Sequence, residues 1–141
     1  MWISASPLLR TALLADAVAS GTAGAFVVLD NDLAARWFGL PADPLSAAGL
    51  FCLAYAVLVA VLSSARSLPT PLVWAVVGGN AAWAAGTVAL LAWPGLQPTG
   101  WGQAFVIGQA VAVMTLTVLQ FIGLRRSGRL AAAGSLPLVG G

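Results

Sequence analysis

One charged side chain, Asp16, lies well inside an apolar run of the sequence, and it is the residue from which chemistry is most readily expected. A carboxyl group in that setting can hold a proton, bind a cation or accept hydrogen bonds. An aspartate near the centre of a membrane helix costs about 3 kcal/mol on insertion scales, so it faces protein or water and has a partner. Asp16 follows Arg10 by six residues, which places it about 9 Å deeper along a helix.

Helical rise counted from the ends of the apolar runs identifies the polar side chains that reach a similar depth. Gln120 lies about 7.5 Å inside Arg125 by this count, and Tyr55 lies about 16 Å inside Arg66. With Asp16, the candidate intramembrane polar cluster consists of Ser20, Tyr55, Asn80, Gln109, Thr117 and Gln120. Two interpretations stay open. In the first, the cluster stabilises helix packing through interhelical hydrogen bonds, each worth about 0.6 kcal/mol. In the second, Asp16 is the proton or cation site of a small transporter.

Residue types that most enzymes and metal sites need are scarce in this sequence. It has no histidine, which removes His-based zinc sites, bis-histidine haem ligation and Ser-His or Cys-His nucleophile pairs. The single cysteine, Cys52, lies in an apolar stretch and is interpreted as a small buried hydrophobe. We therefore expect no enzyme activity, no metal and no cofactor.

The elements that position these residues follow from the composition. Sixty per cent of the 141 residues are apolar, 7% are charged, and the mean hydropathy is +0.97. A soluble domain carries roughly a quarter charged residues, so this chain is predicted to be one membrane domain, 1–141. Its apolar runs have or approach the ~20 residues that cross a bilayer. The sequence predicts an all-α bundle of four transmembrane helices at about 11–29, 45–64, 71–93 and 101–124.

Two segments lie outside these spans. Residues 30–40 are either an amphipathic helix on the membrane surface or an irregular loop. In the helical alternative Asn31 or Asp32 is the cap, and Leu33, Trp37 and Leu40 share the apolar side. Residues 127–141 form a short, glycine-containing tail that we expect to be flexible.

The distribution of arginine predicts the orientation in the membrane. The opposite side carries one arginine, Arg36, together with three aspartates. By the positive-inside rule, both termini are cytoplasmic. High Ala and Gly with Arg in place of Lys suits a GC-rich bacterial genome, so the expected location is a bacterial inner membrane. The arginines that fall together on the predicted cytoplasmic side are Arg10, Arg66, Arg125, Arg126 and Arg129.

Internal similarity and small residues bear on helix packing. Residues 51–59 align with 105–113 and place Tyr55 on Gln109, which indicates either two duplicated helical hairpins or chance similarity between Ala/Val-rich helices. Small residues four apart permit close backbone approach, within the bundle or against a partner subunit equally well. Such pairs are Ala17 with Gly21, Ser20 with Gly24, Ala75 with Gly79, and Ala82 with Gly86.

Two resemblances follow from these residues. Segments 14–21, 79–83 and 119–126 resemble a group of short bacterial four-helix proteins described only as hypothetical integral membrane proteins, which lends no activity. More loosely, an acidic residue in the first of four helices resembles the small multidrug resistance transporters. That resemblance implies that Asp16 exchanges protons for cationic drugs. The chain departs from that family in having Asp for Glu, greater length, a strong charge bias and no clear counterparts of the aromatic drug-site residues.

We therefore expect a non-enzymatic membrane protein that acts through helix packing, as a homo-oligomer or as an accessory subunit of a larger complex. Its surroundings are the lipid bilayer, and no nucleic acid is expected as a partner. The alternative is proton-coupled transport or binding of a small compound through Asp16. A sealed, hydrogen-bonded Asp16 favours packing, a water-accessible cavity favours transport, and an exposed stripe of small residues favours a partner subunit.

Overall fold

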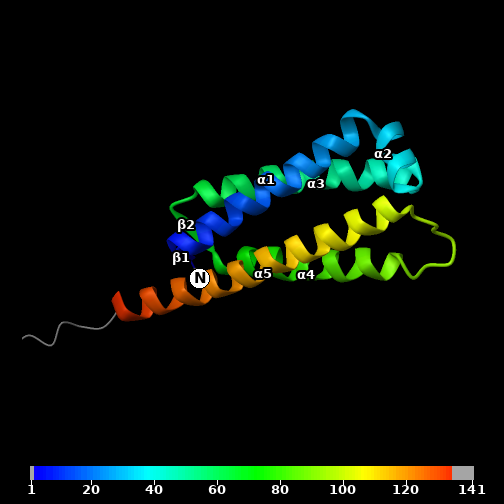
Figure 1. The fold of residues 1–141 in the computed structure, drawn as a ribbon. Coiled ribbons are helices and arrows are strands. Elements are labelled where there is room, and N and C mark those ends of the chain that lie inside the picture. The colour runs from blue at the N-terminus through cyan, green and yellow to red at the C-terminus, as the bar shows by residue number, and fades with distance from the viewer. Residues whose placement is uncertain (1, 135–141) are drawn as a thin grey trace, which may run out of the picture.

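The computed structural model describes residues 2–134, and four long helices dominate this part of the chain (Figure 1). Each is long and apolar enough to cross a membrane. This arrangement confirms the predicted all-α four-helix bundle of a multi-pass membrane protein. The four spanning helices are α1 (Pro7–Leu29), α3 (Ala42–Ser64), α4 (Thr70–Leu90) and α5 (Gly100–Gly134).

The helices form two hairpins that meet along one main seam. Helix α1 packs against α3 and α5, and α5 packs against α4. Helices α3 and α4, although consecutive among the spanning helices, approach each other closely in few places. If the hairpins were exact copies related by a two-fold axis, the seam between α3 and α4 would match the one between α1 and α5. The two seams differ, and the duplication stays a prediction.

The helix ends differ from the predicted spans for local reasons. Helix α1 begins at Pro7 instead of about residue 11, because the Ser6 hydroxyl accepts a hydrogen bond from the Leu9 amide and proline suits a first turn. Helix α5 continues past residue 124 to Gly134. The expected flexible tail is therefore wrong over 127–134, because Gly128, the glycine inside this stretch of helix, costs only about 1 kcal/mol there. The remainder of the predicted tail, 135–141, lies outside the described residues.

Between α1 and α3 lies the short helix α2 (Asn31–Phe38), which confirms the helical alternative for residues 30–40. Its cap is Asp30, whose carboxylate accepts a hydrogen bond from the Leu33 amide at 3.1 Å; neither of the two predicted caps does this. The face turned inward carries Ala34 and Phe38. The predicted apolar side is therefore not the buried one, and Trp37, a member of that side, is 57% exposed.

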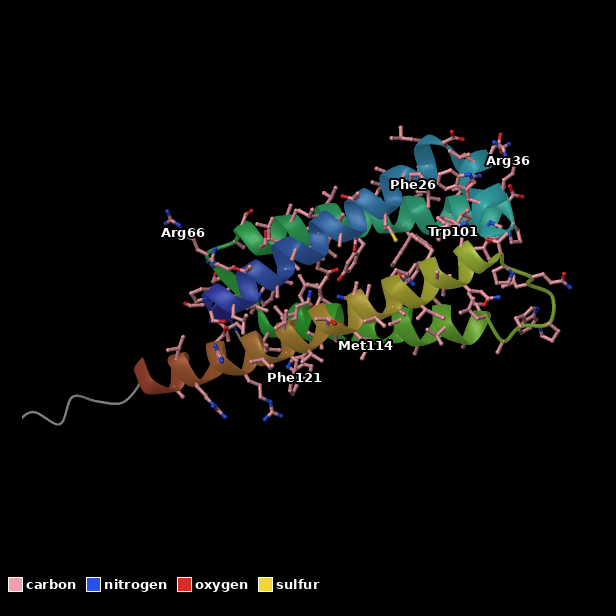
Figure 2. The ribbon with its side chains drawn as sticks, in the orientation of Figure 1. Phe26, Arg36, Arg66, Trp101, Met114 and Phe121 are labelled. Atoms are coloured by element: carbon pink, nitrogen blue, oxygen red, sulfur yellow. The ribbon has the colours of Figure 1, made fainter. Side chains whose placement is uncertain are left out.

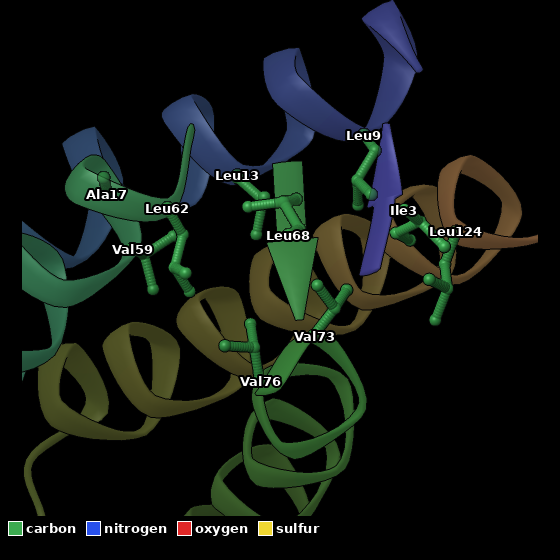
Figure 3. Close-up of a cluster of buried hydrophobic side chains, with 10 residues drawn as sticks. All are labelled: Ile3, Leu9, Leu13, Ala17, Val59, Leu62, Leu68, Val73, Val76 and Leu124. Atoms are coloured by element: carbon green, nitrogen blue, oxygen red, sulfur yellow. The ribbon is translucent and has the colours of Figure 1, made fainter. Parts of the chain in front are cut away.

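At the opposite end of the bundle, two short strands pair in a way that the hydropathy pattern did not predict. Strand β1 (Trp2–Ser4) runs antiparallel to β2 (Ser67–Pro69), with Ile3 opposite Leu68. These two side chains are buried together with residues of all four spanning helices (Figure 3). The pairing thus closes this end of the bundle over an apolar core, which we call the β-end cluster. Its members are Ile3, Leu9, Leu13, Ala17, Val59, Leu62, Leu68, Val73, Val76 and Leu124.

Candidate functional site

All four spanning helices bring a polar side chain to one point in the interior of the bundle. Asp16 lies nine residues into α1, and Asn80 lies ten residues into α4, or about 14 and 15 Å by helical rise. Tyr55 lies nine residues before the end of α3, again about 14 Å from the same end. Because the hydrocarbon layer is about 30 Å thick, these depths correspond to the middle of a bilayer.

The Asp16 carboxylate lies at the centre of these polar side chains, and only 1% of the residue's surface is exposed. Its Oδ2 atom accepts hydrogen bonds from the Tyr55 hydroxyl at 2.8 Å and from the Asn80 and Gln120 amides at 2.7 Å each. Its Oδ1 atom accepts a bond from the Ser20 hydroxyl at 3.3 Å. No arginine forms an ion pair with it in the described part of the chain. We call these five residues the Asp16 network.

The Tyr55 hydroxyl has two acceptors and a single hydrogen to donate. It lies 2.8 Å from Asp16 Oδ2 and also 2.8 Å from Asn80 Oδ1. If Asp16 is neutral with its proton on Oδ2, Asp16 donates to Tyr55 and Tyr55 donates to Asn80, so every oxygen in this chain of bonds has a partner. If Asp16 is ionised, Tyr55 donates to the carboxylate and Asn80 Oδ1 loses its donor. The single Tyr55 hydrogen can therefore satisfy only one of its two neighbouring oxygens at a time.

An apolar layer separates the Asp16 network from the β1–β2 end of the bundle. One helical turn nearer that end, each spanning helix carries an apolar side chain of the β-end cluster, and these side chains are at most 6% exposed (Figure 3). This layer covers Asp16 on the side of the β1–β2 end. The four residues are Leu13, Val59, Val76 and Leu124.

On the other side of the Asp16 network, toward α2, lies a second group of polar and aromatic side chains. The Trp83 indole donates to Gln109 Oε1 at 3.2 Å, and the Gln109 amide donates to the Thr87 hydroxyl at 2.9 Å. The Phe51 ring stacks on Trp83 with centroids 5.3 Å apart. Phe51 comes from α3 and Trp83 from α4, so large side chains fill the seam where these two helices stay apart.

The structure brings most of the predicted cluster together. Asp16, Ser20, Tyr55, Asn80 and Gln120 form the network, whereas Gln109 belongs to the second group, with Trp83 and Thr87. Thr117 is buried one turn from Gln120, but its hydroxyl donates to the Val113 carbonyl of its own helix at 2.7 Å. Depth counting could not separate these cases, because it gives the level of a residue and not the direction of its side chain.

Sequence reasoning missed the aromatic contact between Phe51 and Trp83, although Trp83 falls three residues after Asn80 on a shared helix face. No group of His, Cys, Asp or Glu side chains suited to a metal ion occurs within residues 2–134. Comparisons of the chain with protein-family models, curated proteins and solved structures found no match. The two resemblances stay predictions, and function has to be inferred from the geometry.

Proposed function

We propose that the protein is a non-enzymatic membrane subunit that acts through helix packing, and that α4 is the helix that docks against a neighbouring transmembrane helix. The observation that carries this proposal is a row of open glycines on α4. An added Cβ atom at Gly78, Gly79 or Gly86 would meet nothing within 4 Å. Since glycine costs about 1 kcal/mol relative to alanine in a helix, these positions call for a reason beyond the chain itself.

Gly24 and Gly123, in contrast, have a clear reason inside the molecule. A Cβ atom on Gly24 of α1 would fall 2.7 Å from the Gly49 carbonyl oxygen of α3. A Cβ atom on Gly123 of α5 would fall 2.8 Å from the Leu9 backbone. These glycines permit close approach of two helices of the same chain. The open glycines of α4 offer the same close approach to a helix from outside it.

The open glycines are part of a regular surface. Ala75, Gly79, Ala82 and Gly86 follow one another at intervals of three or four residues, so they share one face of α4, and all four are exposed. We call them the α4 face. Small residues at this spacing allow helix backbones to approach closely in a membrane, where van der Waals packing drives association.

The sealed state of Asp16 supports a packing role. The carboxyl group accepts four hydrogen bonds and is covered by the apolar layer of the β-end cluster. Such a centre holds all four helices at one relative height, so the α4 face is presented on a defined scaffold.

The test is the mass of the purified protein in mild detergent. A homo-oligomer has a mass that is a multiple of the 14.2 kDa chain, and an accessory subunit retains one companion protein in fixed ratio. Gly86→Leu is expected to release either partner. Gly108→Leu, at an exposed glycine of α5 where an added Cβ atom also meets nothing within 4 Å, is expected to leave the mass unchanged. A monomeric wild-type protein without a companion, or equal behaviour of the two variants, contradicts the proposal.

The proposed setting is a bacterial inner membrane with both termini in the cytoplasm. The charge asymmetry supports it, because Arg10, Arg66 and Arg125 lie toward the β1–β2 end, whereas Arg36 lies at the α2 end. In a Cys52→Ala background, Gln97→Cys is expected to react with an impermeant maleimide on intact spheroplasts, and Ser67→Cys only after lysis. The reverse pattern contradicts this orientation.

Proton-coupled transport of a small compound is a second candidate, and the Tyr55 hydroxyl placed between the Asp16 carboxyl group and the Asn80 carbonyl oxygen favours it. Its test is uptake of a lipophilic cation such as tetraphenylphosphonium into proteoliposomes whose interior is acidic. Asp16→Asn is expected to abolish the uptake, whereas Asp43→Asn, at the start of α3, is expected to retain it. Absence of gradient-driven uptake by the wild type, or equal uptake by Asp16→Asn, contradicts this candidate.

A further inference from the structure

The β1–β2 end of the bundle is strongly basic and has no acidic side chain to balance it among the described residues. The aspartates other than Asp16 occur in or beside α2 and at the start of α3, at the far end. In Figure 2 the β1–β2 end is marked by Arg66 and the α2 end by Arg36. No arginine forms an ion pair within residues 2–134. The counter-charges for this end must therefore come from outside the described chain.

A shallow, open surface cavity lies at this end between the first turn of α1 and the part of α5 that extends beyond the other helices. Its charged wall carries Arg126 and Arg129, which are three residues apart and so project from one face of α5. Both are exposed. Its other wall is the start of α1, where the helix dipole places a partial positive charge. The lining residues are Ser6, Pro7, Leu8, Arg126, Arg129 and Leu130.

The two walls are held together by a buried clamp. The backbone amide of Ser6 donates to the Ser127 hydroxyl at 2.9 Å, and the Ser6 hydroxyl donates to the Gly123 carbonyl at 2.9 Å. Ser6 is 4% exposed and Ser127 is 1% exposed. Because Ser127 lies between the two arginines in sequence, the clamp places their backbone directly beside the α1 terminus. The cavity is thus preformed in the fold.

We propose that this cavity binds the phosphate headgroup of an anionic phospholipid from the surrounding leaflet. The cavity lies where α1 and α4 begin and α3 ends, which is the level of the headgroups if these helices span the hydrocarbon layer. Two guanidinium groups are suited to phosphate oxygens. Leu8 and Leu130 give the cavity an apolar part beside the charges, as a lipid requires and free phosphate does not. The inference is independent of the α4 face.

The experiment is native mass spectrometry of the full chain, reconstituted with phosphatidylcholine and phosphatidylglycerol and then released into mild detergent. The wild type is expected to retain phosphatidylglycerol in preference to phosphatidylcholine. The variant Arg126→Gln/Arg129→Gln is expected to retain it at least about tenfold less, because the charge-assisted hydrogen bonds from the two guanidinium groups to the phosphate are lost. Both substituted side chains are exposed, so the fold is expected to be kept, as circular dichroism can verify.

The matched control is Arg66→Gln/Arg125→Gln, which removes the same charge from the same end but outside the cavity. Arg125 is four residues from Arg129, but it does not line the cavity: its guanidinium lies over the Phe121 ring at 4.8 Å, and Phe121 contacts Trp74 of α4. The control is expected to retain phosphatidylglycerol like the wild type. Equal loss in both double variants would show general surface attraction and overturn the proposal. Displacement of the lipid by millimolar inorganic phosphate would show that the cavity recognises free phosphate, and would contradict a lipid headgroup as the bound group.

Discussion

The Tyr55 hydroxyl of α3 lies 2.8 Å from Oδ2 of Asp16 in α1. This contact joins the two helices of the first hairpin. Asn80 and Gln120 approach the same oxygen from α4 and α5. A single oxygen atom thus links all four spanning helices. The first two predictions concern what happens when its bonds are removed.

Asp16→Leu is expected to destabilise the bundle, whereas Asp16→Asn is expected to be tolerated. Leucine leaves the Asn80 and Gln120 amides without their shared acceptor, and each orphaned buried group costs about 1–3 kcal/mol. Asparagine can accept from both amides through its carbonyl and donate to Ser20 through its amide. Unfolding of the purified protein in mixed detergent measures the difference. An Asn variant that fails to accumulate while the Leu variant does would contradict this account.

Tyr55→Phe is expected to lower the free energy of unfolding by about 0.6–1.7 kcal/mol, the range for polar contacts between membrane helices. The ring is kept, so its stacking on Phe51, with centroids 6.4 Å apart, is preserved. Only the bonds to Asp16 and Asn80 are lost. Detergent unfolding followed by circular dichroism provides the measurement. A Phe variant as stable as the wild type would mean that the hydroxyl contributes nothing to the network.

Gly24→Ala is expected to destabilise the first hairpin by about 1–3 kcal/mol, as overpacking of a tight interface does. The new methyl group would meet the Gly49 carbonyl oxygen at 2.7 Å, so α1 and α3 must separate. Gly108→Ala on α5 is the control, because nothing lies within 4 Å of its added Cβ atom. The control is expected to be neutral or to gain up to about 1 kcal/mol from helix propensity. Thermal unfolding of both variants distinguishes the outcomes.

Ser6→Ala is expected to cost about 1 kcal/mol through the lost helix cap and to loosen the start of α1. The same hydroxyl also donates to the Gly123 carbonyl, so its removal weakens the contact with α5. Amide hydrogen exchange is expected to rise in the first turn of α1. Ser64→Ala, whose exposed hydroxyl bonds only to the Ala60 carbonyl of its own helix, is expected to leave this exchange unchanged. Similar exchange in the two variants would contradict the clamp.

The four spans could be predicted from the sequence because transfer into lipid depends on runs of apolar residues, and Pro69, Pro71 and Pro94 mark their limits. The end of α5 could not be predicted in this way, since nothing in hydropathy prevents a helix from continuing into water. The pairing of β1 with β2 could not be predicted either, because each strand has only three residues and depends on contacts distant in sequence.

The candidate site could be predicted in part. Asp16 was identifiable because its charge is costly in an apolar run, and depth counting then selected Asn80 and Gln120. The same counting included Thr117, whose hydroxyl is satisfied within its own helix. It also gave no sign of the clamp between Ser6 and Ser127, since contacts between the first and last helices follow from bundle topology and not from any local pattern.

Gln120 follows Asp16 by 104 positions in the sequence, and this separation has a consequence for biosynthesis. At a translation rate of about 5–20 residues per second, the carboxyl group waits about 5–20 s for its last amide partner. During that interval it has Ser20 and Tyr55 at first, and Asn80 only after α4 has been made. In a nascent chain halted before its final helix, the Asp16 carboxyl group therefore lacks the Gln120 hydrogen bond within the bilayer. This missing bond is a physical difference between an unfinished chain and a completed one that the cell's insertion machinery can detect.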